Sequence, residues 1–289
     1  MRILSPAKIN LHLRIGPPAP DGFHPLLSWM CTLGLHDTIE MSAAGKPGIR
    51  LKCDRPDVPV DETNLIVRAG RALDERRGAD VTLQKNVPMG GGLGGGSSNA
   101  AFALIGFNQI WNLNFSMSQL AEIGALLGSD VPFFLHGPSS VCAGRGERAM
   151  PIPKPAAKFA VLFFPKLSMS TAAVYRRFDE MKLGSSQALA RQPDWAAWTK
   201  LPAGELLQGL VNDLEAPAFS LQPDLGEMRR HIERRIGRIV RMTGSGSTLF
   251  TLTDDRQGAA AAAAEVRGDS TNAEWFELAP DLATKSDLV

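Results

Sequence analysis

Glycine occupies six of the seven positions from 90 to 96, within the segment PMGGGLGGGSSNAA at residues 88–101. Glycine loses more backbone freedom on folding than any other residue, so this density indicates a sharp bend or a close approach to a ligand. The segment follows an alternating stretch, DVTLQKNVP, and precedes helix-forming residues. In a strand–loop–helix arrangement, unpaired backbone amides and the helix dipole favour an anion at the same spot. The tract is therefore predicted to bind phosphate.

Three common glycine-rich motifs fit this tract poorly. Gly90, Gly92 and Gly95 match G-x-G-x-x-G, but a dinucleotide fold places this pattern after its first strand, with an acidic residue about 20 residues later. Here three or more expected strands precede the tract, and the region near residue 115 reads NFSMSQ. A Walker A loop needs a lysine that the tract lacks, and a protein-kinase loop leads to a strand. A hinge or close helix packing stays open as the non-binding alternative.

The residues around Asp130 predict its position in the chain but no chemical role. It follows Gly128, which is expected to end a helix, and it precedes Pro132, so it lies at the end of a loop. On local sequence alone this position is typical of a helix N-cap, with the proline in the first turn.

The residues around Lys8 likewise predict only a position. It precedes a strictly alternating stretch at 9–15, which predicts a half-buried strand with Lys8, Asn10 and His12 on its polar face. Taken alone, this position is typical of a solvated lysine on an edge strand.

Further elements are expected to position these groups in the first half of the chain. Strands are predicted at 26–42 and 49–53, and a helix capped by Thr63 or Asn64 is predicted to end at Gly78. After the tract, Ser97 or Ser98 is predicted to cap a helix reaching about Trp111. Ser116 and Gln119 form a capping box for a helix that ends at Gly128.

The second half begins at an expected hinge, marked by prolines at 151, 153 and 155. Strands are predicted at KFAVLFFP, RIVRM, TLFTLTD and AEWFELAP, with helices at STAAVYRRFDEM, DLGEMRRHIERRIG and RQGAAAAAAEVRG. Residues 184–210 are expected to be loop-like with helical pieces. The pattern predicts an α+β layer with helices on one face of a sheet, and a second glycine loop at TGSGS.

Composition limits the classes of function. The chain has 289 residues, about two domains of ordinary length, and a net charge of +1 that gives no general attraction to nucleic acid or membranes. Its apolar runs are shorter than the roughly 18 residues of a membrane span, and the N-terminus lacks the apolar part of a signal peptide. Cys31, Cys53 and Cys142 are odd in number and lack metal-ligand spacing. We expect a cytoplasmic monomer or homodimer with reduced thiols that binds neither nucleic acid nor membranes.

The tract PMGGGLGGGSSNAA resembles the phosphate loop of the GHMP kinases, a family of galacto-, homoserine, mevalonate and phosphomevalonate kinases. PAKINLHL with DGFHPL, GSDVPFFLHG, and MTGSGSTLF resemble the branch that acts on a cytidine diphosphate-linked methylerythritol. The likeness runs from residue 6 to about residue 250. It implies a two-domain α+β fold, with an ATP-binding domain at 1–152, a C-terminal domain at 153–289, and the active site in the cleft between them.

The resemblance implies that the γ-phosphoryl of ATP is transferred to the 2-hydroxyl of this substrate, in the non-mevalonate isoprenoid pathway. It assigns Asp130 as the base for the hydroxyl proton and Lys8 as the ammonium that stabilises the reacting oxygens. Mg²⁺ is expected with ATP; Ser97 or Ser98 could reach it, and no acidic ligand is identified. The implied nucleotide-binding residues are Pro88, Met89, Gly90, Gly91, Gly92, Leu93, Gly94, Gly95, Gly96, Ser97 and Ser98.

Substrate contacts are also implied by the resemblance. Phe23 and Tyr175 correspond to two rings that enclose the cytosine, and His24 to the residue that reads its edge; without the resemblance, core packing explains the rings equally well. The family usually has Tyr where this chain has Phe23, so stacking is kept and the hydroxyl is lost. Asn10 corresponds to a residue beside the methylerythritol part. Thr171 corresponds to a contact with one of its hydroxyls, although SMSTAAVY lacks the prolines common there.

Several secondary predictions complete the set. Lys85 is expected at the surface, and Asn64 and Leu65 occupy a stretch that approaches adenine in the family. The arginine-rich helix at 224–237 is expected to present a solvated face rather than an RNA-facing stripe, because glutamates interleave its arginines. Two other functions stay open: a GHMP kinase for another small alcohol, and a nucleotide-binding module without catalysis.

Overall fold

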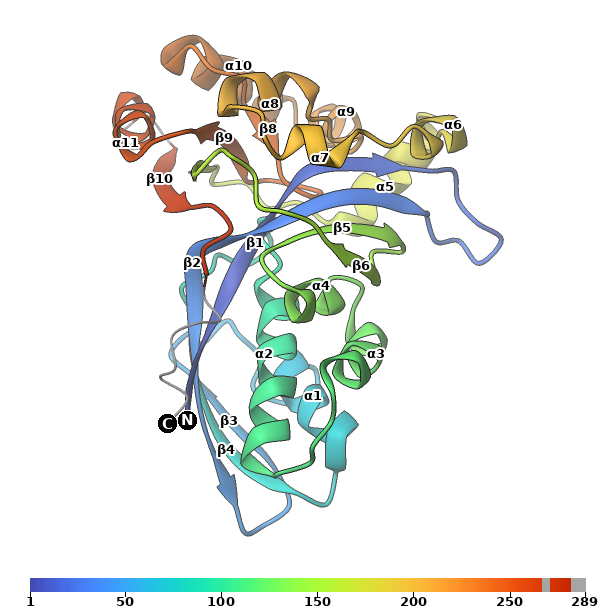
Figure 1. Ribbon diagram of the computed structural model, residues 1–289, viewed down its shortest axis with the longest axis vertical. Coiled ribbons are helices and arrows are strands. Elements are labelled where there is room, and N and C mark those ends of the chain that lie inside the picture. The colour runs from blue at the N-terminus through green and yellow to red at the C-terminus, as the bar shows by residue number, and fades with distance from the viewer. Residues whose placement is uncertain (267–270, 282–289) are drawn as a thin grey trace.

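The computed structural model describes residues 1–266 and 271–281, and Figure 1 shows two sheets in an elongated molecule. In the first sheet β3, β4, β2, β5 and β6 lie side by side, and β1 also pairs with β2. The β3–β4 pair is parallel and the other pairs are antiparallel. The strands are β1 (Arg2–Ile15), β2 (Leu26–Ala44), β3 (Gly48–Cys53), β4 (Gly78–Gln84), β5 (Ser139–Gly144) and β6 (Arg148–Pro151).

Four helices cover one face of this sheet (Figure 1). The core between them is apolar, and the rings of Phe107 and Trp111 stack in it with centroids 4.7 Å apart. Among residues 1–266 and 271–281, no helix has both the length and the apolar character needed to cross a bilayer. The helices are α1 (Leu65–Asp74), α2 (Gly95–Ile110), α3 (Met117–Leu127) and α4 (Val131–His136).

The second sheet has the order β10-β7-β9-β8, and all its pairs are antiparallel. Alternate residues of β7 face opposite sides, as the pleat requires: Val161 and Phe163 pack on α5, α10 and α11, while Ala160 and Leu162 pack on α8, β1 and β2. One face is therefore covered by helices, as predicted, and the other rests largely on the first half. The strands are β7 (Phe159–Phe164), β8 (Arg241–Met242), β9 (Leu249–Thr253) and β10 (Asn272–Glu277).

The remaining helices belong to this second half. α10 and the alanine-rich α11 occur where the sequence predicts them, and the stretch at 184–210 contains three short helices. The helices are α5 (Thr171–Glu180), α6 (Ser186–Ala190), α7 (Trp195–Trp198), α8 (Ala203–Gly209), α9 (Glu215–Leu221), α10 (Pro223–Ile236) and α11 (Arg256–Glu265).

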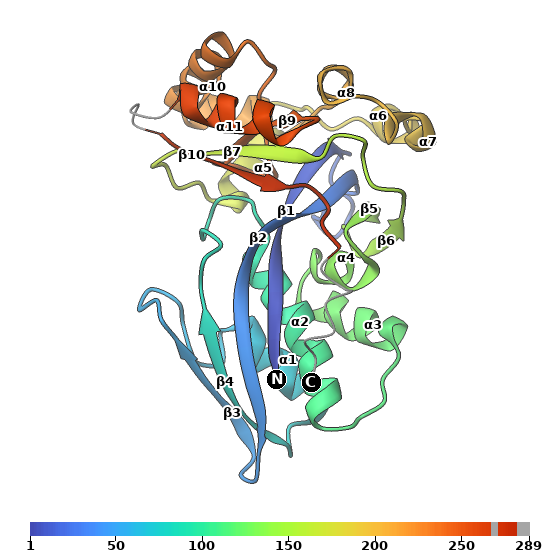
Figure 2. The ribbon, with the colours of Figure 1, turned by 60° about the vertical axis from the view of Figure 1, so that its left-hand side comes forward.

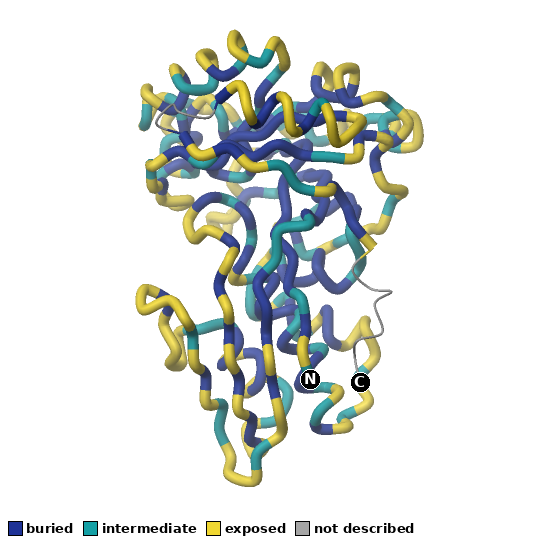
Figure 3. Tube along the Cα trace, turned by 90° about the vertical axis from the view of Figure 1, so that its left-hand side faces the viewer, coloured by how far each residue is buried: buried dark blue, intermediate teal, exposed yellow. Residues whose placement is uncertain are grey.

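Strands β1 and β2 join the two halves. Figure 2 shows the second sheet lying across their end, and Figure 3 shows buried backbone concentrated where the halves meet. Leu13 bridges to Asn212, and Leu33 bridges to Leu278. β1 is consequently buried along nearly its whole length, which corrects the prediction of a half-buried strand. The prediction treated β1 as facing water, but the second half covers it.

A register shift in β1 also corrects the predicted polar face. Asn10 pairs with Met30 and His12 with Trp29, so Leu11 is an extra residue, the arrangement of a β-bulge. Lys8 and Asn10 face a cavity, but the next residue to do so is Leu13. His12 lies instead among Trp195 and Trp198, with ring centroids 5.9 and 5.4 Å away.

Local signals succeed at some helix ends and fail at others. The capping box of Ser116 and Gln119 is present, and Asn64 caps α1 through the N–H of Ile66. α1 ends at Asp74 rather than Gly78, because Gly78 already belongs to β4. α2 begins at Gly95, with Gly94 at its N-cap and no capping side chain, so neither Ser97 nor Ser98 is its cap.

Candidate active site

The glycine tract lines a cavity of about 380 Å³. Between β4 and α2, Gly90, Gly92 and Gly94 have φ angles of 73°, 76° and 68°, a left-handed region that favours glycine. The first N–H groups of a helix have no partner within it, and no side chain caps α2. These amides are therefore available to an anion, and the helix dipole adds to the attraction.

Most of the predicted nucleotide-binding residues meet at this cavity. Ser98 is the clearest exception, because its hydroxyl is buried and lies 2.8 Å from the hydroxyl of Ser5. Gly91 does not line the cavity either. Asn64 and Leu65, expected near adenine, lie in its wall. The tract residues that line it are Pro88, Met89, Gly90, Gly92, Leu93, Gly94, Gly95, Gly96 and Ser97.

Three glycines are needed here because other groups occupy the space of a side chain. A Cβ on Gly92 would lie 2.5 Å from the carbonyl oxygen of Thr243, in the second glycine loop. A Cβ on Gly94 would lie 2.9 Å from Cε of Lys8, and one on Gly95 would lie 2.8 Å from Nζ of Lys85. The tract thus brings its backbone against the second loop and two lysines.

Lys85 is buried, which corrects the prediction of a surface residue. Its Nζ lies 2.5 Å from Oδ2 of Asp37, which also accepts a 2.8 Å bond from Asn99 Nδ2. Oδ1 of Asp37 accepts the backbone N–H groups of Asn86 and Val87, both at 2.8 Å. Asp37 is fully buried, so this cluster anchors the chain as it enters the tract.

Lys8 and Asp130 meet, although they are far apart in the sequence and local patterns carry no sign of it. Lys8 Nζ lies 3.2 Å from Asp130 Oδ2, and their side chains are 5% and 30% exposed. Asp130 occupies the N-cap position of α4 but makes no capping bond, so its carboxylate is directed to the lysine. Lys8 also donates a 2.6 Å bond to Asn10 Oδ1, and its backbone N–H bonds to Leu93 of the tract.

Both residues line a second cavity, of about 820 Å³. Its wall comes from both halves of the chain, with Lys8, Asn10 and Asp130 from the first and Thr171 and Tyr175 from the second. Gly92 and Gly94 line this cavity as well as the first one. The two cavities therefore adjoin at these glycines, and Gly94 lies against Lys8.

Aromatic rings gather in the second cavity. His24 and Tyr175 have ring centroids 5.3 Å apart, and Phe23 is 53% exposed. His24 Nδ1 lies 2.9 Å from the carbonyl oxygen of Gly16, and its Nε2 lies 3.3 Å from Asp179 Oδ1. Burial, followed by the charge of Asp130, raises the pKa of Tyr175 to about 12, so its hydroxyl stays neutral.

One face of Phe23 is covered by a cation. The guanidinium carbon of Arg145 lies 4.0 Å from the ring centroid, within the range of a cation–π contact. Arg145 also pairs with Asp21, on the same loop as Phe23. Phe23, His24 and Arg145 all line the cavity, so this loop and the β5–β6 turn form one of its edges.

Thr171 links α5 to the second glycine loop. Its hydroxyl lies 2.8 Å from the hydroxyl of Ser245, and both residues line the second cavity. Asn10 approaches the same loop from β1, because its backbone N–H donates a 2.9 Å bond to Thr243 Oγ1.

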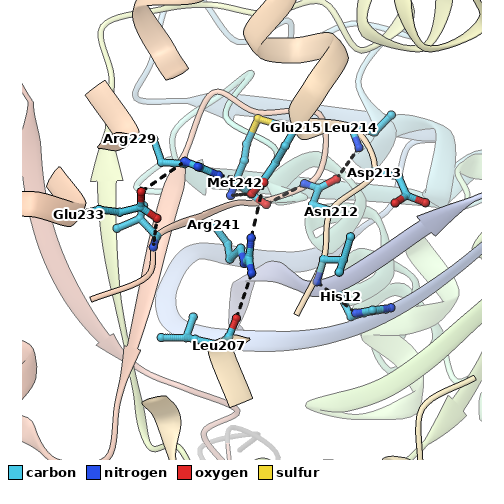
Figure 4. Close-up of polar contacts among 12 residues, drawn as sticks. His12, Leu207, Asn212, Asp213, Leu214, Glu215, Arg229, Glu233, Arg241 and Met242 are labelled. Atoms are coloured by element: carbon cyan, nitrogen blue, oxygen red, sulfur yellow. Dashed lines mark hydrogen bonds and ion pairs between the residues drawn. The ribbon is translucent and has the colours of Figure 1, made fainter. Parts of the chain in front are cut away.

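The side-chain amide of Asn212 holds the second glycine loop and the end of β8 (Figure 4). Its Nδ2 donates to the carbonyl oxygens of Met242 and Gly244, at 2.7 and 2.8 Å. Its Oδ1 accepts the N–H of Leu214 at 2.9 Å, which fixes the orientation of the amide. The backbone N–H groups of Leu13 and Asp213 complete a short pairing of this segment with β1.

Glu215 adds a largely buried carboxylate to the same support (Figure 4). Its Oε1 accepts the N–H of Met242 at 2.8 Å, and its Oε2 lies 3.2 Å from Arg229 and 3.9 Å from Arg241. Burial raises the pKa of Glu215, and the Met242 N–H and the two arginines oppose that rise.

The chain offers few metal ligands at this site. Within residues 1–266 and 271–281 there is no group of three His, Cys, Asp or Glu side chains that could hold a metal ion. Mg²⁺ in phosphoryl-transfer sites is bound mainly by phosphates and water, with one or two protein ligands. Ser97, in the wall of the first cavity, fits that limited part, whereas the Ser98 hydroxyl is engaged with Ser5.

Sequence reasoning missed several residues around the two cavities. Asp179 could have been found, because it lies four residues after Tyr175 and so on the same helix face. Asn212 begins NDLE, a string typical of a turn that leads into a helix. Asp37 and Arg145 carry no local signal, because their partners lie on distant segments.

Comparison with known proteins gives an independent result. Residues 64–138 match the model of the GHMP kinases N terminal domain, and residues 199–269 match that of the GHMP kinases C terminal region. The 4-diphosphocytidyl-2-C-methyl-D-erythritol kinase of Bacillus pumilus is 37% identical over 87% of this chain and 88% of the relative. The enzyme of the same name from Nocardia farcinica is 35% identical, over 92% and 89%.

Solved structures agree with this result. A crystal structure of 4-(cytidine 5'-diphospho)-2C-methyl-D-erythritol kinase superposes with a TM-score of 0.79 at 32% identity, covering 97% of this chain and 100% of that one. Homoserine kinase from Cytophaga hutchinsonii has a TM-score of 0.71 at 14% identity, over 97% and 94%, and this likeness concerns the fold alone. The chain therefore belongs to the GHMP kinases, in the family of the 4-diphosphocytidyl-2-C-methyl-D-erythritol kinases, and is a small-molecule kinase with their two-domain α+β fold.

Proposed function

We propose that this kinase transfers the γ-phosphoryl group of ATP to the 2-hydroxyl of 4-(cytidine 5'-diphospho)-2-C-methyl-D-erythritol, a step of non-mevalonate isoprenoid synthesis. The observation that carries the proposal is the shared edge of the two cavities, where Gly92 and Gly94 line both and the Lys8–Asp130 pair lies in the second. A phosphoryl donor in one cavity and an alcohol in the other meet at that edge. The names and identities of the relatives support the same substrate.

The reaction assigns a separate task to each charged residue. The oxygen of the substrate hydroxyl forms a bond to the γ-phosphorus while the bond from that phosphorus to the ADP oxygen breaks. Asp130 accepts the proton of this hydroxyl. Lys8 donates hydrogen bonds to the carboxylate and to the oxygens on which charge develops. The tract amides at the start of α2 hold the phosphates, so placement and electrostatics supply most of the rate.

Magnesium is proposed as the metal that accompanies ATP. Ser97 is the residue of this chain that would hold it, together with phosphate oxygens and water. When bound, Mg²⁺ neutralises phosphate charge. The open N-terminus of α2 fits such a complex, since it leaves its amides to the phosphates rather than to a capping side chain.

The second cavity is proposed to hold the cytidine and the methylerythritol parts of the substrate. Phe23 and Tyr175 enclose the base, and His24 reads its edge. The cation on one face of Phe23 fixes a ring that lacks the hydroxyl usual in the family. Asn10 and Thr171 lie toward the reacting end, beside Lys8 and the second glycine loop.

Three features of the cellular protein belong to the same proposal. We place the division between the two domains at residues 152 and 153, within the proline-marked segment that leads to β7. The protein is proposed to act as a monomer or homodimer, without nucleic-acid or membrane partners. A cytoplasmic location agrees with its three unpaired cysteines, which suit a reducing compartment.

A coupled assay of ADP release tests this function, with and without the cytidylated substrate. The wild type is expected to release ADP only with the substrate, and CDP is expected to compete. Asp130→Asn should lower kcat by about 10²- to 10⁴-fold while ATP binding is kept, since it removes the proton acceptor and little else. Asp80→Asn, which changes an exposed carboxylate on β4, is the control.

Two results would count against the proposal. Normal turnover by Asp130→Asn would remove the assignment of the base. ADP release with mevalonate or homoserine that CDP does not inhibit would favour a kinase of another small alcohol.

A further inference from the structure

The amide of Asn10 is held at both ends inside the protein. Its Oδ1 accepts the 2.6 Å bond from Lys8 Nζ, and its Nδ2 donates a 2.8 Å bond to Ser28 Oγ. Ser28, on β2, is fully buried and donates a 2.9 Å bond to the carbonyl oxygen of His12. A continuous row of hydrogen bonds thus runs from the carboxylate of Asp130 through Lys8, Asn10 and Ser28 to the backbone.

The direction of these bonds is determined by the two ends of the row. The His12 carbonyl can only accept, so the Ser28 hydroxyl must donate to it and present a lone pair to Asn10. The nitrogen of the Asn10 amide must then face Ser28, which places its oxygen toward Lys8. An ammonium can only donate, so the other orientation of the amide would set donor against donor.

The backbone at Asn10 is fixed as well. The side-chain amide therefore has little freedom except rotation about the Cβ–Cγ bond. The N–H of Asn10 bonds to Thr243 Oγ1, and the bulge at Leu11 begins directly after it. Bulges near active sites commonly re-aim side chains. Here the bulge sets the position of the Asn10 amide, and Ser28 holds its nitrogen so that its oxygen faces Lys8.

We propose that Ser28 is a positioning residue for catalysis: its hydroxyl fixes the orientation of the Asn10 amide and, through it, the place of the Lys8 ammonium beside Asp130. The inference rests on the proposed function, because the proposed function assigns Lys8 and Asp130 their catalytic tasks. Ser28 does not line either cavity, so it acts only through Asn10. Lys8 keeps one of its three donors for the substrate once the other two are bound to Asn10 and Asp130.

Removal of the hydroxyl has a predictable consequence. In Ser28→Ala the nitrogen of the Asn10 amide loses its acceptor, and the bond from Lys8 is then the only one of the two that still holds the amide. We expect kcat to fall about tenfold, the effect of one lost hydrogen bond at the reacting groups, with KM for ATP unchanged. Ser28→Thr keeps the hydroxyl and is expected to restore most of kcat.

The chain provides a matched control for burial. Ser140, on the neighbouring strand β5, is equally buried, and its hydroxyl has no hydrogen-bond partner among the residues that the structure describes. Ser140→Ala is expected to leave kcat unchanged. Equal kcat for the wild type and Ser28→Ala, or an equal fall in kcat for both alanine variants, would overturn the proposal.

A double-mutant cycle separates positioning from a general effect on folding. If Ser28 acts through Asn10, Ser28→Ala should cause no further fall in kcat in a chain that already carries Asn10→Ala. A fall of the same size in both backgrounds would contradict the inference. Thermal unfolding of each variant shows that the compared proteins are folded.

A structure of Ser28→Ala supplies a measurement independent of turnover. Lys8 Nζ outside hydrogen-bond distance of Asn10 Oδ1 supports the inference, and an unchanged Lys8–Asn10–Asp130 arrangement overturns it. The wild-type assay keeps the two proposals apart. A wild type that does not phosphorylate the cytidylated substrate counts against the proposed function, whereas an active wild type with an equally active Ser28→Ala counts against the role of Ser28.

Discussion

The glycine tract at 90–96 and the glycine loop TGSGS at 243–247 look alike in composition but lead into different elements. The first leads into α2, so the free amides of a helix N-terminus open into its cavity. The second joins β8 to β9, and Gly244 and Ser245 line the larger cavity. The two loops touch, because the space for a Cβ on Gly92 is taken by the carbonyl of Thr243.

Their supports differ as well. A buried carboxylate and ammonium, Asp37 and Lys85, anchor the first loop within the first half of the chain. The amide of Asn212 holds the second loop and connects it to β1, and the carboxylate of Glu215 holds Met242 just before the loop. Glycine content therefore indicates only that the backbone comes close to something. The element that follows the loop, and the groups behind it, decide whether it binds phosphate or shapes the alcohol site.

The largest expected effect comes from breaking the anchor of the first loop. In Asp37→Asn the new amide places a donor against Lys85 and Asn99, so an uncompensated ammonium is left buried. We expect the free energy of unfolding to fall by about 3–5 kcal/mol, measured by urea denaturation. Asp80→Asn removes one partner of the exposed Arg50–Asp80 pair and should leave the urea midpoint almost unmoved. Similar curves for the two variants would show that the buried pair is not an anchor.

Acid is expected to weaken the support of the second loop. Burial, then the charges of Arg14 and Arg241, lowers the pKa of His12 from 6.5 to about 4. Its Nδ1 accepts the N–H of Val211, next to Asn212, and protonation removes that acceptor. The pKa of His12 is lower in the folded protein than in the unfolded chain. The contribution of neutral His12 to the free energy of unfolding is therefore complete above pH 6.5 and is lost as the pH falls toward 4.

Between pH 6.5 and pH 4 we expect the protonation of His12 to lower the free energy of unfolding by about 3 kcal/mol. Unfolding free energies measured between pH 7 and pH 4 check it, with His12→Gln as the comparison. Glutamine does not titrate, so the variant should show a shallower dependence on pH. An identical slope for both proteins would mean that His12 is not the group responsible.

Contact between the two loops can be tested at Gly92. Alanine there must adopt a φ angle of 76° and place its Cβ 2.5 Å from the Thr243 carbonyl oxygen, so the loops must separate. A shift of about 1 Å at reacting groups can cost about a hundredfold, and we expect kcat/KM of Gly92→Ala to fall by that order. Gly204→Ala, in α8 with open space around it, is the control. Activity within a few fold of wild type in Gly92→Ala would show that the contact is dispensable.

The two loops also differ in how far the sequence could predict them. The first loop was predictable because its signal is local: a strand pattern, glycines, and helix formers within a few residues. The same holds for the capping box of Ser116 and Gln119. Lys8 and Asp130 came from resemblance alone, since only packing between β1 and the start of α4 brings them together.

The wrong sequence predictions have a common physical cause, because each depends on pairing between distant segments of the chain. Lys85 was misplaced because its partner, Asp37, lies on another strand. His12 was misplaced because the bulge at Leu11 depends on how β1 registers with β2, and alternation within one strand carries no record of it. The role of Asn212 depends on the folded chain, in which its amide bonds to the carbonyl oxygen of Gly244 in the second loop.

The smallest expected effect concerns the link between the second loop and α5. Thr171→Val keeps the shape of the side chain but removes the hydroxyl that lies 2.8 Å from Ser245. One partly exposed hydrogen bond contributes about 1 kcal/mol, so KM for the cytidylated alcohol should rise several-fold. KM for ATP should not change, because Thr171 lines only the larger cavity. Thr171→Ser, which keeps the hydroxyl, should behave as wild type; an equal rise in both KM values would instead mean that the second loop also positions the nucleotide, and that the two loops do not divide their tasks.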